Sequence, residues 1–279
     1  MGTIFRISLK ETLRKRLIFA AGGLTFLFLF LFFLFLKWVG PPPALPESQY
    51  LAGLSYLYLG LFAAYVMIAL FSVLIFVASV SGEIDDGTLL AVIQRPIDRW
   101  RLLLGKWTGL SLVAVAYATI LFFGLVLIDQ AQYGVVVGSL GSLLASYSDF
   151  LLEALLVGTV TLLGSTLTAT MTNGIVVSSA VLIAFLGGAL EQLGTITASH
   201  PTAAFTAIGW ITSLLIPTDA LYRRALYQIL GNHVFPGAVS GFGPFGAAHP
   251  PGEGMVLYAI LYTAGMLMLT IGSFARRDL

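Results

Sequence analysis

The chain has 279 residues, of which 58% are hydrophobic and 10% are charged, whereas about 25% of the residues in a soluble domain are charged. This composition excludes an ordinary soluble domain and predicts a polytopic membrane protein. The formal net charge of +1 gives no sign of a nucleic-acid partner. The absence of cysteine excludes disulfides, thiolate metal sites and cysteine nucleophiles.

The first 16 residues are basic, and Phe5, Leu9 and Leu13 lie four positions apart. This spacing predicts a helix that lies on the membrane surface. A secretory signal peptide is the alternative interpretation. However, the apolar run over residues 17–36 is too long for a signal core and lacks a small-residue cleavage pattern.

Hydropathy predicts six membrane-spanning helices, and therefore an all-α membrane protein with a single transmembrane domain over residues 1–279. The predicted spans cover residues 17–38, 52–80, 107–128, 150–171, 174–190 and 255–274. A tight turn at Thr172-Asn173-Gly174 is expected to join the fourth span to the fifth.

The connection between the second and third spans, residues 81–106, is the densest charged stretch of the chain. Such a segment cannot lie in hydrocarbon, so we expect a loop in water. Asp85, Asp86 and Thr88 have side chains that can cap the start of a helix. Leu89, Leu90 and Ile93 follow at helical spacing, and Pro96 ends the helical pattern. The pattern predicts a short helix at about residues 84–94 whose apolar face meets a partner protein.

The basic residues indicate the orientation of the chain. With the N-terminus inside, eleven of the 14 Lys and Arg residues fall in residues 1–16, in the loop of residues 81–106 and at the C-terminal Arg276-Arg277. The positive-inside bias therefore places both termini and this loop in the cytoplasm.

Residues 191–254 are expected to form the one large extracytoplasmic segment. Ala203 to Ile216 is apolar but short and ends at Pro217, which favours a re-entrant or interfacial piece. Apolar residues of the stretch 218–230 share one side, with Arg223, Arg224 and Gln228 elsewhere, which predicts a helix on the membrane surface. Residues 236–254 are rich in Gly and Pro and are expected to form a loop.

Few ionisable residues fall near span centres. Glu153 is the one candidate, and it is expected near the outer end of the fourth span, which counts against ion-coupled transport. Asp149, Glu153 and Glu191 are candidates for a substrate path on the outer side. A metal site is a further interpretation, but the acidic residues show no ligand spacing, so no metal is predicted.

Small residues recur every four positions on the fifth span, at Ala180, Ala184 and Gly188. Such a stripe lets helices approach closely. It predicts packing inside the helix bundle or, alternatively, a homodimer interface.

The loop and the C-terminus together resemble a known family. The residues that carry the resemblance are Glu83, Gly87-Thr88-Leu89, Pro96-Ile97, Arg99, Gly105-Lys106 and the tail Phe274 to Leu279. They are similar to the cytoplasmic-loop signature and tail of ABC-2 type permeases, the membrane subunits of ATP-binding-cassette exporters. Within that family the layout resembles most the permeases of nitrous-oxide-reductase maturation systems.

The resemblance implies a non-catalytic subunit that couples ATP hydrolysis by a separate chain to export. Its implied partners are two copies of a cytoplasmic ABC ATPase, which would bind the ATP and Mg²⁺, and a second copy of itself in a prokaryotic cytoplasmic membrane. Glu83, Asp86, Gly87 and Thr88 would shape the start of the coupling helix. Its buried contacts would be Leu89, Leu90 and Ile93.

Two alternatives stay open. A permease-like subunit could transmit force to an extracytoplasmic partner at residues 191–254 instead of moving a solute. A membrane scaffold or enzyme without transport activity is the other. No zinc motif, nucleophile elbow or phosphate-binding loop supports an enzyme.

Overall fold

The computed structural model describes residues 16–40, 46–87, 98–134, 139–197, 203–230 and 251–276. Within these ranges the structure is helical and contains no strand, which confirms the predicted all-α fold. The helices are α2 (Arg16–Val39), α3 (Pro46–Phe76), α4 (Ser81–Asp85), α6 (Arg99–Tyr133), α7 (Leu140–Leu167), α8 (Thr170–Thr197), α9 (Ala203–Leu215), α10 (Thr218–Leu230) and α11 (Glu253–Arg276). The surface helix predicted at residues 1–16 lies almost entirely outside the described residues.

Six of the described helices are long and apolar enough to cross a membrane, which agrees with the predicted number of spans. Their limits are Ile18–Val39, Tyr50–Asp85, Arg99–Tyr133, Leu140–Leu167, Thr170–Gly194 and Glu253–Arg276. The helices extend beyond the predicted spans because hydropathy marks only the most apolar part of a helix. The fourth begins at Leu140, not near residue 150, and the Ser139 hydroxyl accepts a hydrogen bond from the Ser142 N–H at its first turn.

The turn predicted at Thr172-Asn173-Gly174 is wrong. The chain breaks at Thr168 and Ala169, and α8 already begins at Thr170. The physical reason is the environment of Asn173, whose amide donates hydrogen bonds to the carbonyls of Val77 and Thr161. These bonds hold Asn173 inside a helix, where its turn preference does not apply.

Helices α9 and α10 form one broken element, bent by 104° at Ile216 and Pro217. Such a pair is either a broken span or a re-entrant loop, so the re-entrant or interfacial position of residues 203–216 stays a prediction. The surface position predicted for residues 218–230 is wrong. Most of α10 is buried, including Tyr222 and Arg223, because acidic side chains of neighbouring helices pair with its arginines.

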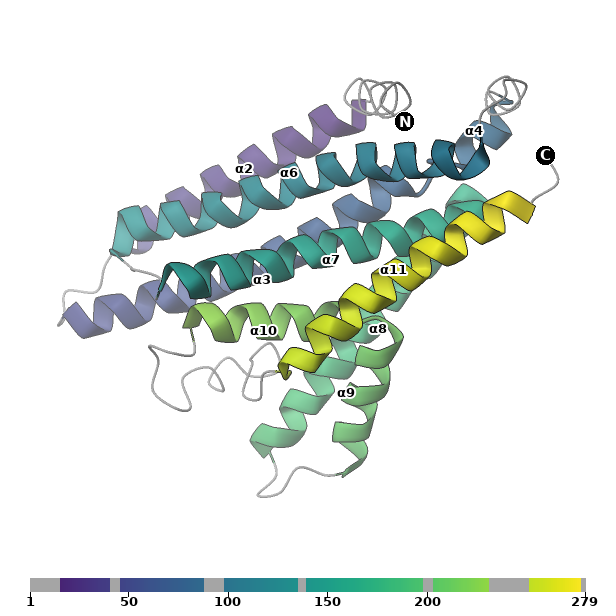
Figure 1. The fold of residues 1–279 in the computed structure, drawn as a ribbon. Coiled ribbons are helices and arrows are strands. Elements are labelled where there is room, and N and C mark those ends of the chain that lie inside the picture. Colours follow the sequence, from purple (N-terminus) through teal and green to yellow (C-terminus); the bar gives the residue numbers. More distant parts are fainter. Residues whose placement is uncertain are drawn as a thin grey trace.

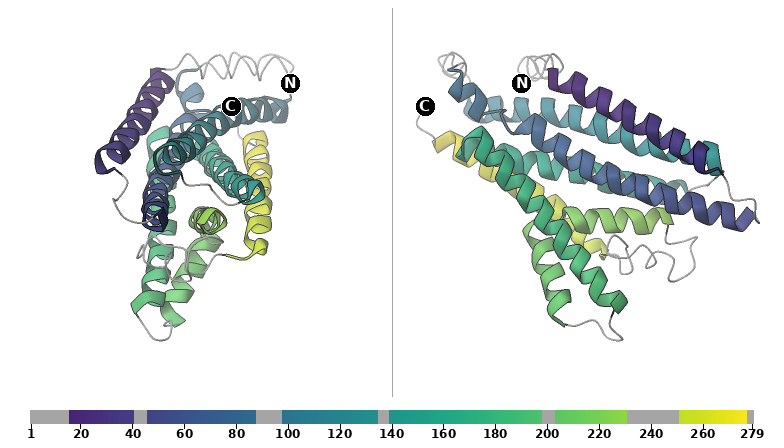
Figure 2. Two further views of the ribbon diagram at one scale, coloured as in Figure 1. Left: turned by 90° about the vertical axis from the view of Figure 1, so that its left-hand side faces the viewer. Right: turned by 180° about the vertical axis from the view of Figure 1, so that it is seen from behind.

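Figures 1 and 2 show how the helices are arranged. Helices α3, α6, α7 and α10 form the centre, and α2 and α11 lie on opposite sides of them. Helices α8 and α9 form a hairpin that extends away from the other helices. The start of α2, the short α4 and the end of α11 lie at one end of the bundle (Figure 1), which we call the α4 end.

The core is built mainly from aromatic and branched apolar residues. The rings of Phe71 and Tyr117 stack between α3 and α6, with centroids 3.9 Å apart. Phe76 packs so closely on Gly158 of α7 that a Cβ atom at this position would lie 2.5 Å from the ring. Lipid is as apolar as these side chains, so close packing and polar contacts must hold the helices together.

Candidate functional site: the base of the loop between α3 and α6

The chain leaves α3 at Phe76 and turns through residues 77–80 into α4. Helix α4 ends at Asp85, and Gly87 follows in the left-handed region with φ of 69°, as is common just after a helix. We call residues 77–87 the loop base. The predicted helix start at Asp85 and Asp86 is not found there, because these residues end α4 and cap its C-terminus.

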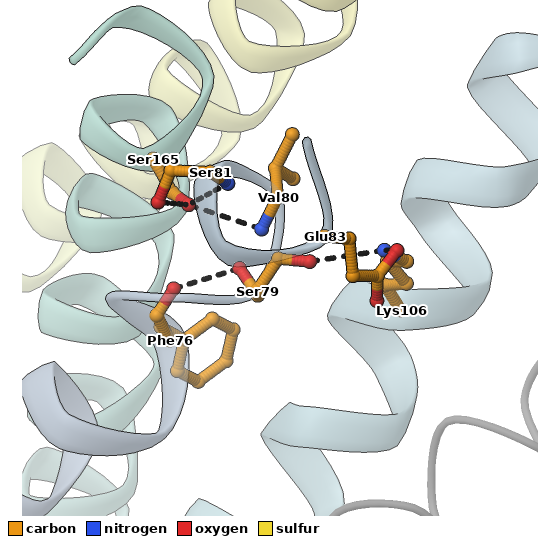
Figure 3. Close-up of polar contacts among 7 residues, drawn as sticks. All are labelled: Phe76, Ser79, Val80, Ser81, Glu83, Lys106 and Ser165. Atoms are coloured by element: carbon orange, nitrogen blue, oxygen red, sulfur yellow. Dashed lines mark hydrogen bonds and ion pairs between the residues drawn. The ribbon is translucent and has the colours of Figure 1, made fainter. Parts of the chain in front are cut away.

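Ser165 of α7 binds the loop base from one side (Figure 3). Its hydroxyl oxygen accepts hydrogen bonds from the backbone N–H groups of Val80 and Ser81, both at 3.0 Å. The Ser81 hydroxyl also contacts that of Thr170 in α8, at 2.7 Å. The first N–H groups of a helix lack partners within it, so a serine from another helix satisfies them here and fastens α4 to α7.

Lys106 of α6 binds the loop base from the opposite side (Figure 3). Its ammonium donates a 2.9 Å hydrogen bond to the Ser79 carbonyl and forms an ion pair with Glu83. Only 7% of Lys106 is exposed. A buried ammonium is tolerated when a carboxylate and further hydrogen bonds replace its water, so Glu83 and Ser79 account for its position.

Asn173 of α8 adds a third connection. Its amide donates to the Val77 carbonyl at 3.3 Å and to the Thr161 carbonyl of α7 at 2.9 Å. The loop base is therefore joined by side-chain hydrogen bonds to α6, α7 and α8.

The start of α6 lies against the end of α11. The Arg99 guanidinium donates to the Ala275 carbonyl at 3.1 Å, and Phe274 is buried in the main core. The loop signature and the tail signature, far apart in the sequence, thus meet in space. Arg101 instead pairs with Asp98 on the surface, at 2.9 Å.

Of the predicted coupling residues, some lie in the loop base or on α6 and others lie outside the described residues. Glu83 and Lys106 are joined, Asp86 caps α4, and Gly87 follows it. Outside the described residues lie Thr88, Leu89, Leu90, Ile93 and Pro96. The resemblance predicted that Lys106 takes part in coupling. No sequence signal indicated its contact with the Ser79 carbonyl or the role of Ser165.

The predicted substrate-path residues belong to a second feature, a buried charged cluster. Ion pairs join Asp149 of α7, Glu191 of α8, and Asp219, Arg223 and Arg224 of α10. Glu191 and Arg224 are partly exposed, and the others are buried. Glu153, also buried, lies one turn after Asp149 on α7. The Arg223 guanidinium pairs with Asp219 and with Glu191, each at 2.8 Å. Arg224 lies 3.6 Å from the Asp149 carboxylate.

Glu153 lies near the middle of α7, not near its outer end as predicted, because the helix begins at Leu140. The arginines of α10 were not expected from the sequence as partners of these acids. The spacing of four between Asp219 and Arg223 was a signal for one ion pair, but nothing in the sequence indicated the pairs between helices. Among the described residues, no group of three or more His, Asp or Glu side chains could hold a metal ion.

The small-residue stripe of α8 faces the bundle. Ala184 is buried in a core cluster with Leu156 and Leu221, and Ala180 packs against it. Gly188 lies against Asp219, so that a Cβ atom there would clash with the carboxylate. The stripe thus lets α10 lie close to α8.

The fold and the loop base define a polytopic α-helical membrane protein whose spans are joined at one end through a polar loop. Comparison with known families goes further: the model of the ABC-2 family transporter proteins matches residues 3–279. The chain therefore belongs to the ABC-2 transporter family, and it is a membrane component of an ABC transporter. No curated protein matches the sequence.

Proposed function

We propose that the chain is the permease subunit of an ABC exporter in a prokaryotic cytoplasmic membrane. A separate cytoplasmic ATPase, present in two copies, binds the loop of residues 81–106 and supplies the ATP and Mg²⁺ sites. Two copies of the present chain form the membrane part. ATP binding brings the two ATPases together, and the loop passes that displacement to the spans.

One observation supports this proposal above the others: the loop base is connected to three different spans. Lys106, Ser165 and Asn173 hold it from α6, α7 and α8. The Lys106 and Ser165 hydrogen bonds are buried and the Asn173 hydrogen bond is partly buried, so water competes little with them. A force applied to the loop therefore reaches several spans at once instead of bending a single flexible connection.

The test is to change the apolar face expected on the loop. Leu90→Asp and Ile93→Asp place a charge where the ATPase is expected to bury apolar side chains, which is unfavourable without a partner. We expect the variants to insert into the membrane but to lose copurification of the ATPase and its stimulation. Ala91→Asp, on the opposite face by helical spacing, is the matched control and should retain both.

If the ATPase still copurifies with Leu90→Asp and Ile93→Asp and its activity remains coupled, the proposed docking is wrong. The force-transmitting alternative places its partner at residues 191–254, of which 198–202 and 231–250 lie outside the described residues. Deleting part of residues 236–254 distinguishes it, since a force transmitter loses its extracytoplasmic partner whereas a solute exporter retains transport.

A further inference from the structure

A narrow apolar groove runs between α3 and α8. It extends from Tyr65 to Val73 along α3 and from Ser178 to Phe185 along α8. Eight residues of helix correspond to about 12 Å. The volume is about 120 Å³, which is of the order of a cavity that holds one benzene ring. Because this small volume is spread over such a length, the groove has the shape of a single extended chain.

Contacts between α8 and the α3 side of the bundle close both ends of the groove. At one end the rings of Phe62 and Phe185 join α3 to α8, with centroids 5.4 Å apart. At the other end the Asn173 amide of α8 donates a hydrogen bond to the carbonyl of Val77, the first residue of the loop base. A chain that occupies the groove therefore enters from the side.

The open side of the groove is continuous with the lipid-facing surface of the spans. Val66, Leu70 and Leu182 line the groove, and they are 38%, 49% and 55% exposed. Both helices belong to the six candidate membrane spans, and α8 is the less buried of the two. The medium at this opening is therefore hydrocarbon. Water is an unsuitable occupant, because the lining is almost entirely apolar.

The shape of an alkyl chain decides how well it fills this groove. Lipid chains are as apolar as the lining side chains, so transfer of a chain from the bilayer gains little from the hydrophobic effect. The gain comes from dispersion contacts with walls on both sides, which are individually small but add up. An unbranched chain can make these contacts along the whole groove, whereas methyl branches would collide with the walls of a narrow one.

We propose that the groove binds one unbranched acyl chain of a bilayer phospholipid and holds it more firmly than the surrounding lipid. Helices α8 and α9 extend away from the rest of the bundle (Figure 2). The bound chain therefore supplies packing between α3 and α8 that the two helices do not provide for each other. The site lies next to the loop base, but the inference does not depend on the proposed transport function.

The test uses the full chain in nanodiscs of diphytanoyl phosphatidylcholine, whose chains are methyl-branched. A minor fraction of palmitoyl phosphatidylcholine carries a photoactivatable diazirine on its chain, and cross-linked residues are mapped by mass spectrometry. Leu70 should be labelled about threefold or more above Leu112 of α6, the free energy of a few extra dispersion contacts. These two leucines are 49% and 48% exposed. Dipalmitoyl phosphatidylcholine should compete for the excess labelling, and additional diphytanoyl lipid should not.

Filling the groove is the second arm of the test. Val181→Phe and Ser178→Phe each replace a lining side chain by a ring and should remove the excess labelling of Leu70. Ile183→Phe adds the same ring on an exposed part of α8 and should retain it. The midpoint of thermal unfolding in detergent is a second readout. Added dipalmitoyl phosphatidylcholine should raise this midpoint in the unchanged chain and in Ile183→Phe, but in neither groove variant.

Three results would overturn the inference: equal labelling of Leu70 and Leu112, equal competition by the branched lipid, or excess labelling that persists in both groove variants. Labelling of Leu112 without labelling of Leu70 would also overturn it, since a second copy of the chain would then cover this face. Because no ATPase takes part, none of these results bears on the docking proposed for Leu90 and Ile93.

Discussion

At the scale of single residues, the loop base depends on side chains that satisfy backbone groups of another segment. Lys106 reaches the Ser79 carbonyl, and Ser165 accepts from Val80 and Ser81. These carbonyl and N–H groups lie where α3 stops and α4 starts, so they lack the usual partners of a continuous helix. The side chains thus allow the chain to turn inside the bundle.

Replacing Lys106 tests this role. Lys106→Met keeps the length of the side chain but removes the ammonium from Glu83 and from the Ser79 carbonyl. The loss should be about 1–3 kcal/mol of unfolding free energy, the cost of leaving buried polar groups without a charged partner, and it should appear as a lower midpoint of thermal unfolding in detergent. Transport should fall while the ATPase still binds, because the docking face is unchanged.

The matched control is Arg101→Met. Its ion pair with Asp98 has both side chains 54% exposed, and such surface pairs contribute about 0–1 kcal/mol. A thermal midpoint that falls equally in both variants would contradict the argument for Lys106. The double variant Glu83→Gln with Lys106→Met should lose less unfolding free energy than the sum of the losses in the two single variants.

At the scale of elements, α10 shows why a charged helix can lie inside a membrane protein. It combines a buried apolar side, with Leu226 and Ile229 in the main core, and two arginines that point to different helices. Arg223 pairs with α8 and Arg224 lies near Asp149 of α7. Taken alone, this amphipathic sequence predicts a surface helix, because two of the acids that pair with its arginines, Glu191 and Asp149, lie 32 or more residues away in the chain.

Removing Arg223 should therefore detach α10 from α8. Arg223→Met leaves the buried Asp219 carboxylate and the partly exposed Glu191 carboxylate without their cation, and breaking a buried pair costs about 3–5 kcal/mol. Arg224→Met is the comparison. Its carboxylate partner is 3.6 Å away and its side chain is 18% exposed, so the expected loss is smaller. Thermal unfolding and limited proteolysis near residues 198–202 would measure the loss of stability in both variants. Equal losses in Arg223→Met and Arg224→Met would show that the Arg223 pairs are not the stronger ones.

At the scale of the whole molecule, the sequence predicted what hydropathy can report and missed what depends on partners. The six spans followed from apolar content alone. The position of Glu153 within its span could not be predicted from apolar content. The serine-rich turn at Ser139 and Ser142 has the composition of a loop, yet it forms the capped first turn of α7. Asn173 and α10 were misjudged for the same reason: contacts with distant helices override their local preferences.

The orientation of the bundle is the remaining prediction at this scale. The start of α2, the loop base and the end of α11 lie at the same end (Figure 1), and the positive-inside bias predicts that this end faces the cytoplasm. Because the chain has no cysteine, single cysteines can report it directly. Asp85→Cys marks the α4 end, and Ala131→Cys marks the last turn of α6 at the opposite end.

In intact cells, a membrane-impermeant maleimide should label Ala131→Cys and should reach Asp85→Cys only after the membrane is permeabilised. Both positions are exposed in the structure, so a difference in labelling reports the side of the membrane, not burial. Labelling in denaturant gives the total of each cysteine. The reverse pattern would place the loop base outside the cell, where no cytoplasmic ATPase could bind it, and the coupling proposed for Lys106 and Ser165 would be wrong.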